Sequence, residues 1–130
     1  MMELDAAWAA GLFEGEGSIE LTCRGGFNPR LAVIVSMSDE DVVRRLHRAV
    51  GYGTVHTILP REPHHKVQWR WRANNLHAGR FLGEIGHHLG ERRRARANEA
   101  LAQWHEGYSV RPGPWAKVQV EALKGVPQCV

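Results

Sequence analysis

The chain has 130 residues, of which 43% are hydrophobic and 24% charged, a composition typical of a single globular domain with one modest core. No apolar run is long enough to cross a membrane, and the first residues lack the basic-then-apolar pattern of a secretory signal. The two cysteines, Cys23 and Cys129, are too few for a zinc site made of cysteine and fit a reducing compartment. We therefore expect a cytoplasmic protein without membrane contact.

The net charge is only +3, but the charges are distributed unevenly. Residues 1–20 hold five acidic side chains and neither lysine nor arginine, whereas residues 61–96 hold nine basic side chains against three acidic ones. A basic surface beside an acidic group is an arrangement suited to holding a polyanion over a metal ion. The simpler alternative is an ordinary solvated run of charges.

The first predicted helix extends from Leu4 to about Glu16. Leu4, Trp8 and Leu12 recur every four residues and are expected to face the core, whereas Ala7, Gly11 and Gly15 form a smooth second face. Each glycine costs a helix roughly 1 kcal/mol relative to alanine. Two glycines at this spacing therefore indicate close approach of another helix.

The last turn of this helix contains Glu14 and Glu16. Carboxylates are unfavourable there because the C-terminal end of a helix carries partial negative charge. A bound cation would remove that penalty, so this helix end is a candidate site.

The next segments alternate as strands and helices. Strands are expected at 18–24 and 31–37 around a glycine- and proline-containing turn, then a helix capped by Ser38 and ended by Gly51-Tyr52-Gly53. A third strand at 54–59 and a fourth at 66–72 follow, and helices begin near Asn75 and at Glu91. The basic helix is expected over 91–104, with Ala95, Leu101 and Trp104 facing inward.

The fourth strand has the clearest alternation in the chain. Val67, Trp69 and Trp71 point to one face, where core packing is preferred to base stacking, and the basic and polar residues between them point to the other. For that polar face, contact with DNA is preferred to a merely solvated surface.

Eight histidines include the adjacent pairs His64-His65 and His87-His88. Neighbouring side chains of a strand point in opposite directions, so neither pair is expected to chelate a metal by itself.

Residues 9–17, AAGLFEGEG, resemble the motif that names the LAGLIDADG homing endonucleases, with glutamate in place of aspartate at both acidic positions. The order of expected elements, αββαββα, is similar to that of the family. The resemblance implies an α+β fold whose four-stranded antiparallel sheet forms a DNA-binding saddle, with additional C-terminal helices. It covers roughly residues 4–104 of an expected domain 1–104; residues 105–130 are expected to be an extension, with a short helix at 115–124.

Because the chain carries one motif, the resemblance implies a homodimer whose motif helices meet through Ala7, Gly11, Glu14 and Gly15. It implies site-specific hydrolysis of double-stranded DNA with Mg²⁺ bound by Glu16 and the Gly15 carbonyl, Mn²⁺ or Ca²⁺ substituting for binding, and no small-molecule cofactor. The resemblance implies that Arg93 is a second catalytic residue, a basic side chain that stabilises the phosphate or the transition state. Arg92 or Arg94 could take that role instead.

The polar strand faces, two loops and the start of the basic helix are the expected DNA-binding surface. Its members are Glu20, Thr22, Arg24, Asn28, Arg30, Arg61, Lys66, Gln68, Arg70, Arg72, Arg92 and Arg94. Arginine can pair with guanine and glutamine with adenine, so this set can distinguish bases.

Two other functions remain open at this stage. The first is a nucleic-acid-binding protein that does not cut, such as an intron maturase or a DNA-binding regulator. It is suggested by a departure from the family's pattern: the place near the end of the second strand where the family often has a polar residue that serves cleavage is held here by Ser36, Met37 or Ser38. The second is a dimeric structural domain in which the glycine face is only an interface.

Overall fold

The computed structural model describes residues 1–22 and 29–109. Its elements are α1 (Glu3–Glu16), β1 (Gly17–Thr22), β2 (Arg30–Met37), α2 (Glu40–Val50), β3 (Thr54–Ile58), β4 (Gln68–Asn74), α3 (Leu76–Ile85), the 3₁₀ turn η1 (Gly86–His88) and α4 (Glu91–Ser109). This order confirms the expected α+β arrangement αββαββα with a further helix behind it.

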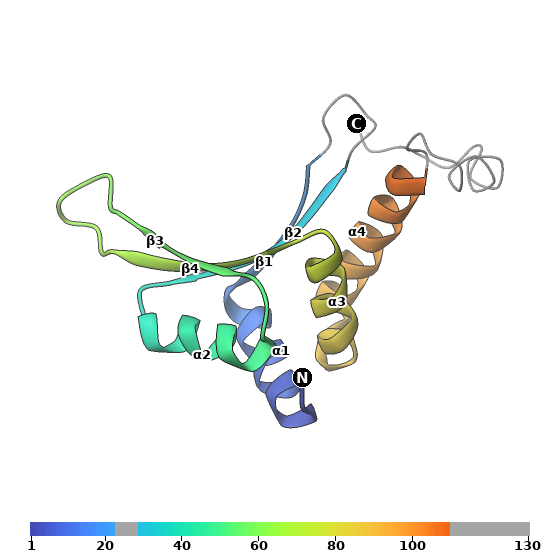
Figure 1. The fold of residues 1–130 in the computed structure, drawn as a ribbon, viewed down its shortest axis with the longest axis horizontal. Helices are drawn as coiled ribbons and strands as arrows, with labels where there is room; N and C mark the ends of the chain where they lie inside the picture. Colours follow the sequence, from blue (N-terminus) through green and yellow to red (C-terminus); the bar gives the residue numbers. More distant parts are fainter. Residues whose placement is uncertain (23–28, 110–130) are drawn as a thin grey trace.

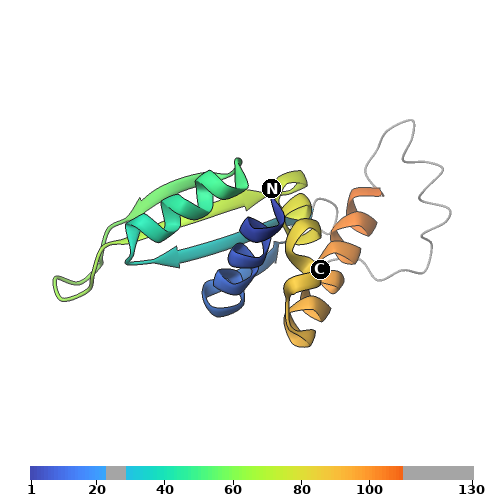
Figure 2. The ribbon, with the colours of Figure 1, turned by 90° about the horizontal axis from the view of Figure 1, so that it is seen from below.

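The four strands form one antiparallel sheet in the order β1-β2-β4-β3. The helices lie on one side of this sheet and leave its other face open, as Figures 1 and 2 show. Successive side chains of a strand point to opposite faces, so each strand contributes one set of residues to the core and another to the open face. Strand β2 lies between β1 and β4 and is buried from Leu31 to Val35.

The core is centred on three aromatic side chains from different elements. The rings of Phe13 and Phe81 meet edge to face with centroids 5.4 Å apart, and the Trp71 ring lies 4.9 Å from Phe81. The Trp71 indole nitrogen donates a hydrogen bond of 3.0 Å to the Tyr52 carbonyl, so this buried polar atom is satisfied. The expected inward direction of Trp71 is therefore confirmed, and α1 is fixed to α3 and to the sheet through this cluster.

The prediction that Leu4 faces the core is wrong, because its side chain is 86% exposed. Trp8 and Leu12 are only half-buried, and the buried residues of α1 are Ala6, Ala9, Ala10 and Phe13. Periodicity identified a helix correctly but not which face is buried. The three alanines bring the α1 backbone close to the sheet and α3, and this turns the Leu4 side outward.

Several element boundaries also differ from the prediction. Strand β4 begins and ends two residues later than the expected 66–72, so Lys66 and Val67 precede it. The N-cap of α2 is Asp39 rather than Ser38, because the Val42 and Val43 amides donate to the Asp39 carbonyl. Strand β3 ends at Ile58, so Leu59 is exposed. Helix α4 continues past the expected end at Trp104, and thus across the expected domain boundary, to Ser109.

Ala95 in α4 was expected to point inward and is exposed. The buried residues of this helix are Ala97, Ala100 and Trp104. These three recur at intervals of three and four residues and so share one face, which Ala95 does not.

The Gly51-Tyr52-Gly53 segment ends α2 as expected. Gly51 caps the helix in the left-handed conformation with φ of 88°, and Gly53 has φ of 89°. A side chain at Gly53 would also collide with the Trp71 indole and the Arg72 carbonyl, so both conformation and space require glycine there.

Asn75 joins β4 to α3 in a backbone conformation with φ of 51°, and we expect its replacement by alanine to destabilise the fold. Its amide donates to the Leu31 carbonyl at 2.7 Å, and its Oδ1 accepts a hydrogen bond of 3.2 Å from the Leu31 amide. Losing the side-chain bond in a strained conformation should lower the free energy of unfolding by about 1–3 kcal/mol in urea denaturation.

The exposed neighbour Asn74 is the matched control, and Asn74→Ala should change that free energy by about 0.5 kcal/mol or less. Asn75→Gly, which tolerates positive φ, should lie between the two. Equal stability of Asn75→Ala and Asn74→Ala would contradict this role.

Within residues 1–22 and 29–109, no helix is both long enough and apolar enough to cross a membrane. The predictions about Cys23, Arg24, Asn28, Cys129 and a helix at 115–124 concern residues outside these ranges.

Candidate functional site

Helix α1 passes directly into β1 without an intervening loop. Gly17 ends the helix, its amide donates to the Phe13 carbonyl, and its extended conformation already belongs to the strand. A side chain at Gly17 would overlap the buried Phe13 ring, so packing rather than conformation requires glycine here. The acidic end of α1 is therefore held in a fixed position at the first residue of the sheet.

Arg93 of α4 binds the end of α1. Its guanidinium donates to the Gly17 carbonyl at 2.6 Å and to the Glu14 carbonyl at 3.2 Å, and its Nε lies 3.6 Å from the Glu14 carboxylate. The other carboxylate oxygen of Glu14 accepts a 2.9 Å hydrogen bond from the Gly90 amide just before α4. The positive charge and donors of Arg93 thus offset the negative helix end.

Glu16 differs from Glu14 although both lie in the last turn. Its side chain is exposed, and no described residue donates a hydrogen bond to its carboxylate or to the Gly15 carbonyl. Both groups are oxygen ligands of the type that Mg²⁺ and Ca²⁺ bind, and one carboxylate with phosphate oxygens suits Mg²⁺. The residues present therefore fit a divalent cation at this helix end.

The exposed face of α1 is made of small residues. Ala7, Gly11 and Gly15 are all exposed, and a Cβ added at Gly11 or Gly15 would have no described atom within 4 Å apart from its chain neighbours and the backbone of its own helix. The described part of the chain therefore gives no packing reason for either glycine. Leu4 continues this face at its N-terminal end.

The open face of the sheet carries the predicted polar residues of its strands. Those that lie on it are Glu20 and Thr22 from β1, Arg30 from β2, and Gln68, Arg70 and Arg72 from β4. The strand register adds residues to this face that the sequence alone did not predict as DNA contacts: Ser18, Ser36, Thr54, His56 and Asn74. His56 pairs with Arg70 and Thr54 with Arg72, but β3 alternates too weakly for sequence alone to reveal its polar face.

The two arginines of β4 are held in place across this face. Arg70 donates to the Ser36 hydroxyl at 3.0 Å, and Arg72 donates to the Asn74 side chain at 2.9 Å. Arg72 also lies 3.7 Å from the Glu20 carboxylate, two strands away. These contacts orient two guanidinium groups near the middle of the open face.

The remaining predicted basic residues fall into separate places. Arg61 and Lys66, together with Gln68, line an open hollow of about 730 Å³ beside the loop between β3 and β4. Arg92 and Arg93, with Arg96, line a second hollow of about 250 Å³.

Arg94 is used within the chain. It donates to the carbonyls of Gly86, His87 and Leu89 at 3.1–3.2 Å, which fixes the turn between α3 and α4.

The perturbed groups near Tyr52 belong to the helix side of the sheet rather than to this face. Burial, and then the nearby Glu84 carboxylate, raises the pKa of Tyr52. Burial alone would raise the pKa of Glu84, but the Met1 ammonium, Arg80 and Tyr52 outweigh it and lower that pKa. This network joins the N-terminus to α3 through the 3.2 Å contact between Met1 and Glu84.

No protein-family model matches the sequence, and no curated protein matches it. The structure, by contrast, is similar to solved homing endonucleases. The homing endonuclease I-CvuI in complex with DNA has a TM-score of 0.64 at 15% identity, covering 98% of this chain and 87% of that chain.

Two further structures extend the comparison. The group I intron-encoded homing endonuclease I-CeuI, complexed with DNA, has a TM-score of 0.64 at 14% identity, covering 96% of this chain and 63% of that one. The homing endonuclease I-TnaI has a TM-score of 0.53 at 15% identity, covering 95% and 100%. The resemblance carried by residues 9–17 is therefore confirmed at the level of the fold: this chain has the fold of the LAGLIDADG homing endonucleases.

Proposed function

We propose that the chain is a site-specific endonuclease that acts on double-stranded DNA inside the cell as a homodimer and depends on Mg²⁺. The observation that carries this proposal is the position of Glu16. Its exposed carboxylate and the Gly15 carbonyl accept no hydrogen bond from the described residues. Both lie at the junction of α1 with β1, an edge strand of the sheet. A metal ligand beside a surface that could hold DNA is an arrangement that supports metal-assisted phosphodiester hydrolysis.

The homodimer is inferred from the exposed face of α1. A single chain supplies one Glu16, and the glycines of α1 have no packing role in the described residues. Packing this face against the same face of a second copy would explain Ala7, Gly11 and Gly15 and would bring two Glu16 side chains together. Glu14 is also proposed at that interface, and its contacts with Gly90 and Arg93 support the helix end as well.

DNA binding is inferred from the open face. Its two oriented arginines, with Gln68 and Asn74, offer donors of the kinds that read guanine and adenine in the major groove. We further propose that Arg30, Arg61, Lys66 and Arg92 contact phosphates of the bound duplex. The solved neighbours I-CvuI, I-CeuI and I-Vdi141I are DNA complexes, which supports the same type of partner here.

The chain's residues divide the work of cleavage. Glu16 and the Gly15 carbonyl would hold the divalent ion, which when bound supplies neutralisation of phosphate charge and lowers the barrier to attack by water. Arg93 fixes the backbone on which both ligands stand, through Gly17 and Glu14. We propose that it acts on the phosphate as well, with Arg92 as its exposed neighbour.

The test is cleavage of a randomised duplex library by the purified chain. With Mg²⁺ we expect a staggered double-strand cut at one family of sequences, and with EDTA or Ca²⁺ we expect binding without cutting. Recovery of bound duplexes that are never cut at any Mg²⁺ or Mn²⁺ concentration would reject the nuclease and favour a binding protein.

That second candidate, specific binding without cleavage, has one observation in its favour. The Ser36 hydroxyl, near the end of β2, accepts a hydrogen bond from Arg70. Its role is therefore to orient a residue of the open face. A binding protein would require the open face and the dimer but not the Glu16 carboxylate.

A further inference from the structure

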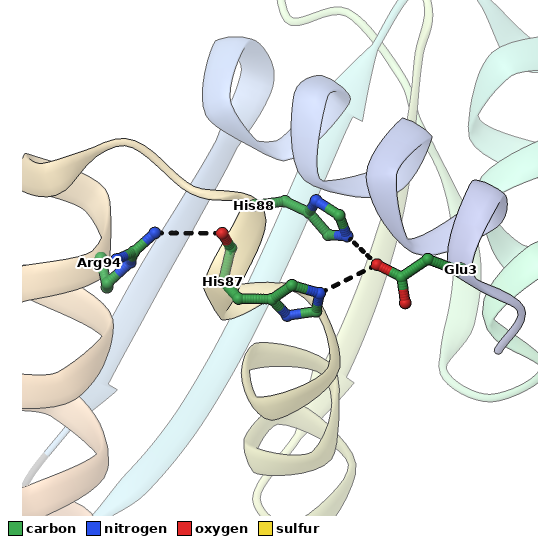
Figure 3. Close-up of polar contacts among 4 residues, drawn as sticks. All are labelled: Glu3, His87, His88 and Arg94. Carbon is green, nitrogen blue, oxygen red and sulfur yellow. Dashed lines mark hydrogen bonds and ion pairs between the residues drawn. The ribbon is translucent and has the colours of Figure 1, made fainter.

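The turn that follows α3 brings two histidines and a glutamate together at one point. The Nε2 atoms of His87 and His88 lie 3.0 Å and 2.6 Å from the same carboxylate oxygen of Glu3. One ligand atom from each of the three residues lies within 4.8 Å of the other two. Figure 3 shows both imidazoles pointing toward Glu3 from one side.

The expectation that the His87-His88 pair does not chelate a metal by itself took no account of a third ligand from α1. That expectation assumed a strand, in which neighbours point in opposite directions. The pair instead lies in the 3₁₀ turn η1, where consecutive side chains are only about 120° apart, so both rings can face α1. Their ring centroids are 4.0 Å apart.

The backbone that carries the two rings is fixed independently of Glu3. Arg94 donates to the carbonyls of Gly86, His87 and Leu89, and the flanking Ile85 and Leu89 side chains are buried. Figure 3 shows the hydrogen bond from Arg94 to the His87 carbonyl, on the side of the turn away from Glu3. The ligands therefore project from a rigid turn and from the first turn of a helix, which limits what must be ordered when an ion binds.

We propose that Glu3, His87 and His88 form a second metal site, which binds a divalent transition-metal ion of borderline softness. Zinc is the ion expected to bind there. Two imidazole nitrogens and a carboxylate are a recurrent zinc ligand set that leaves a fourth position to water. Zinc–ligand bonds of about 2.0–2.2 Å separate the ligand atoms of a tetrahedral site by about 3.4 Å. The present oxygen–nitrogen separations of 3.0 and 2.6 Å are shorter than this, so the ligand atoms would move apart by about 0.4 and 0.8 Å to admit the ion.

The charge state of Glu3 suits a cation. A glutamate carboxylate brings one negative charge to a divalent ion, and the side chain is exposed enough to reach one. Each imidazole must turn its Nε2 lone pair to the ion and carry its proton on Nδ1, and the side chains are exposed enough to permit this.

The site is distinct from the acidic end of α1. Glu3 and Glu16 are separated by 13 residues of helix, which corresponds to about 20 Å along its axis. An ion at Glu3 would join the first turn of α1 to η1 and so stabilise the packing of α1 against α3. It supplies no step of DNA cleavage, and the proposal does not depend on the nuclease function.

The test is zinc titration of the metal-free full chain, without DNA, in competition with a chromophoric chelator. We expect one zinc ion per chain and a thermal midpoint raised by several degrees at a zinc concentration 100 times the dissociation constant. The double variant His87→Gln/His88→Gln should bind at least 100-fold more weakly and lose the thermal shift, and Glu3→Gln should bind at least tenfold more weakly. Circular dichroism checks that each variant folds.

The chain provides a matched control in its other histidine pair. His64 and His65 are adjacent and exposed, with ring centroids 4.3 Å apart, but no described carboxylate completes a cluster with them. His64→Gln/His65→Gln and Glu16→Gln should both retain the zinc ion. Zinc binding that is absent in the original chain, or equal in the His87/His88 variant, would overturn the proposal and leave three ordinary hydrogen-bonded side chains.

Discussion

Glu16→Gln is expected to reduce DNA cleavage by on the order of a thousandfold or more, equivalent to about 4 kcal/mol of barrier, without abolishing DNA binding. The amide keeps the size of the side chain but removes the charge that binds the cation. Because Glu16 makes no hydrogen bond or ion pair with the described residues, its replacement should not disturb the fold. Single-turnover cleavage of the selected duplex, with gel-shift binding in Ca²⁺, measures both effects.

Asp5, one of two acidic residues in the first turn of the same helix, is the control. Asp5→Asn removes one negative charge from α1 while leaving the Gly15–Gly17 segment unchanged, so it should cut at close to the original rate. Glu14→Gln provides a contrast: it weakens contacts to Gly90 and Arg93 and should lower thermal stability. An unchanged cleavage rate for Glu16→Gln would contradict the proposal that the Glu16 carboxylate binds the metal ion.

Gly11→Leu is expected to raise the dissociation constant of the homodimer by at least about 100-fold, because a leucine side chain would separate two closely packed helices. Within one chain the same change meets open space, so the monomer should remain folded. Sedimentation velocity over a range of concentrations measures the association, and circular dichroism measures the fold. Cleavage should fall together with dimerisation.

Gly83 in α3 is a matched control for this change. It is also an exposed helical glycine with no described atom within 4 Å of an added Cβ, but it lies on a different helix. Gly83→Leu should therefore leave the oligomeric state unaltered. Gly11→Ala separates the two requirements further, since alanine should stabilise the helix of a monomer by roughly 1 kcal/mol while opposing the closest helix contact. A stable dimer in Gly11→Leu would exclude this face as the interface.

Sequence patterns predicted the parts of the fold whose periodicity is strong. Helix α1 and strand β4 appear close to where they were expected, and the alternation of Trp69 and Trp71 with Arg70 and Arg72 gave the correct faces. Periodicity could not show whether Leu4 faces the chain's own core or the outside. Both environments favour an apolar residue, and only tertiary packing distinguishes them.

The candidate site was predictable in its residue types but not in its contacts. The motif identified Glu16. The hydrogen bonds of Arg93, however, join residues more than 70 positions apart, and only the folded structure shows them. Arg94 has the same residue type and was a reasonable alternative, but its position one residue further along α4 directs it to the η1 carbonyls. The His87-His88 cluster was missed because its geometry depends on a 3₁₀ turn.

The direct junction between α1 and β1 has a consequence for how recognition and cutting are related. Glu16 is the last residue of the helix and Gly17 the first of a strand whose side chains Ser18, Glu20 and Thr22 lie on the open face. Any bending of β1 against a bound duplex must therefore also displace the Glu16 backbone, since no loop absorbs the motion. Duplexes that fit β1 poorly are expected to be cut more slowly even when they are bound tightly, so selectivity should be greater in kcat than in Kd.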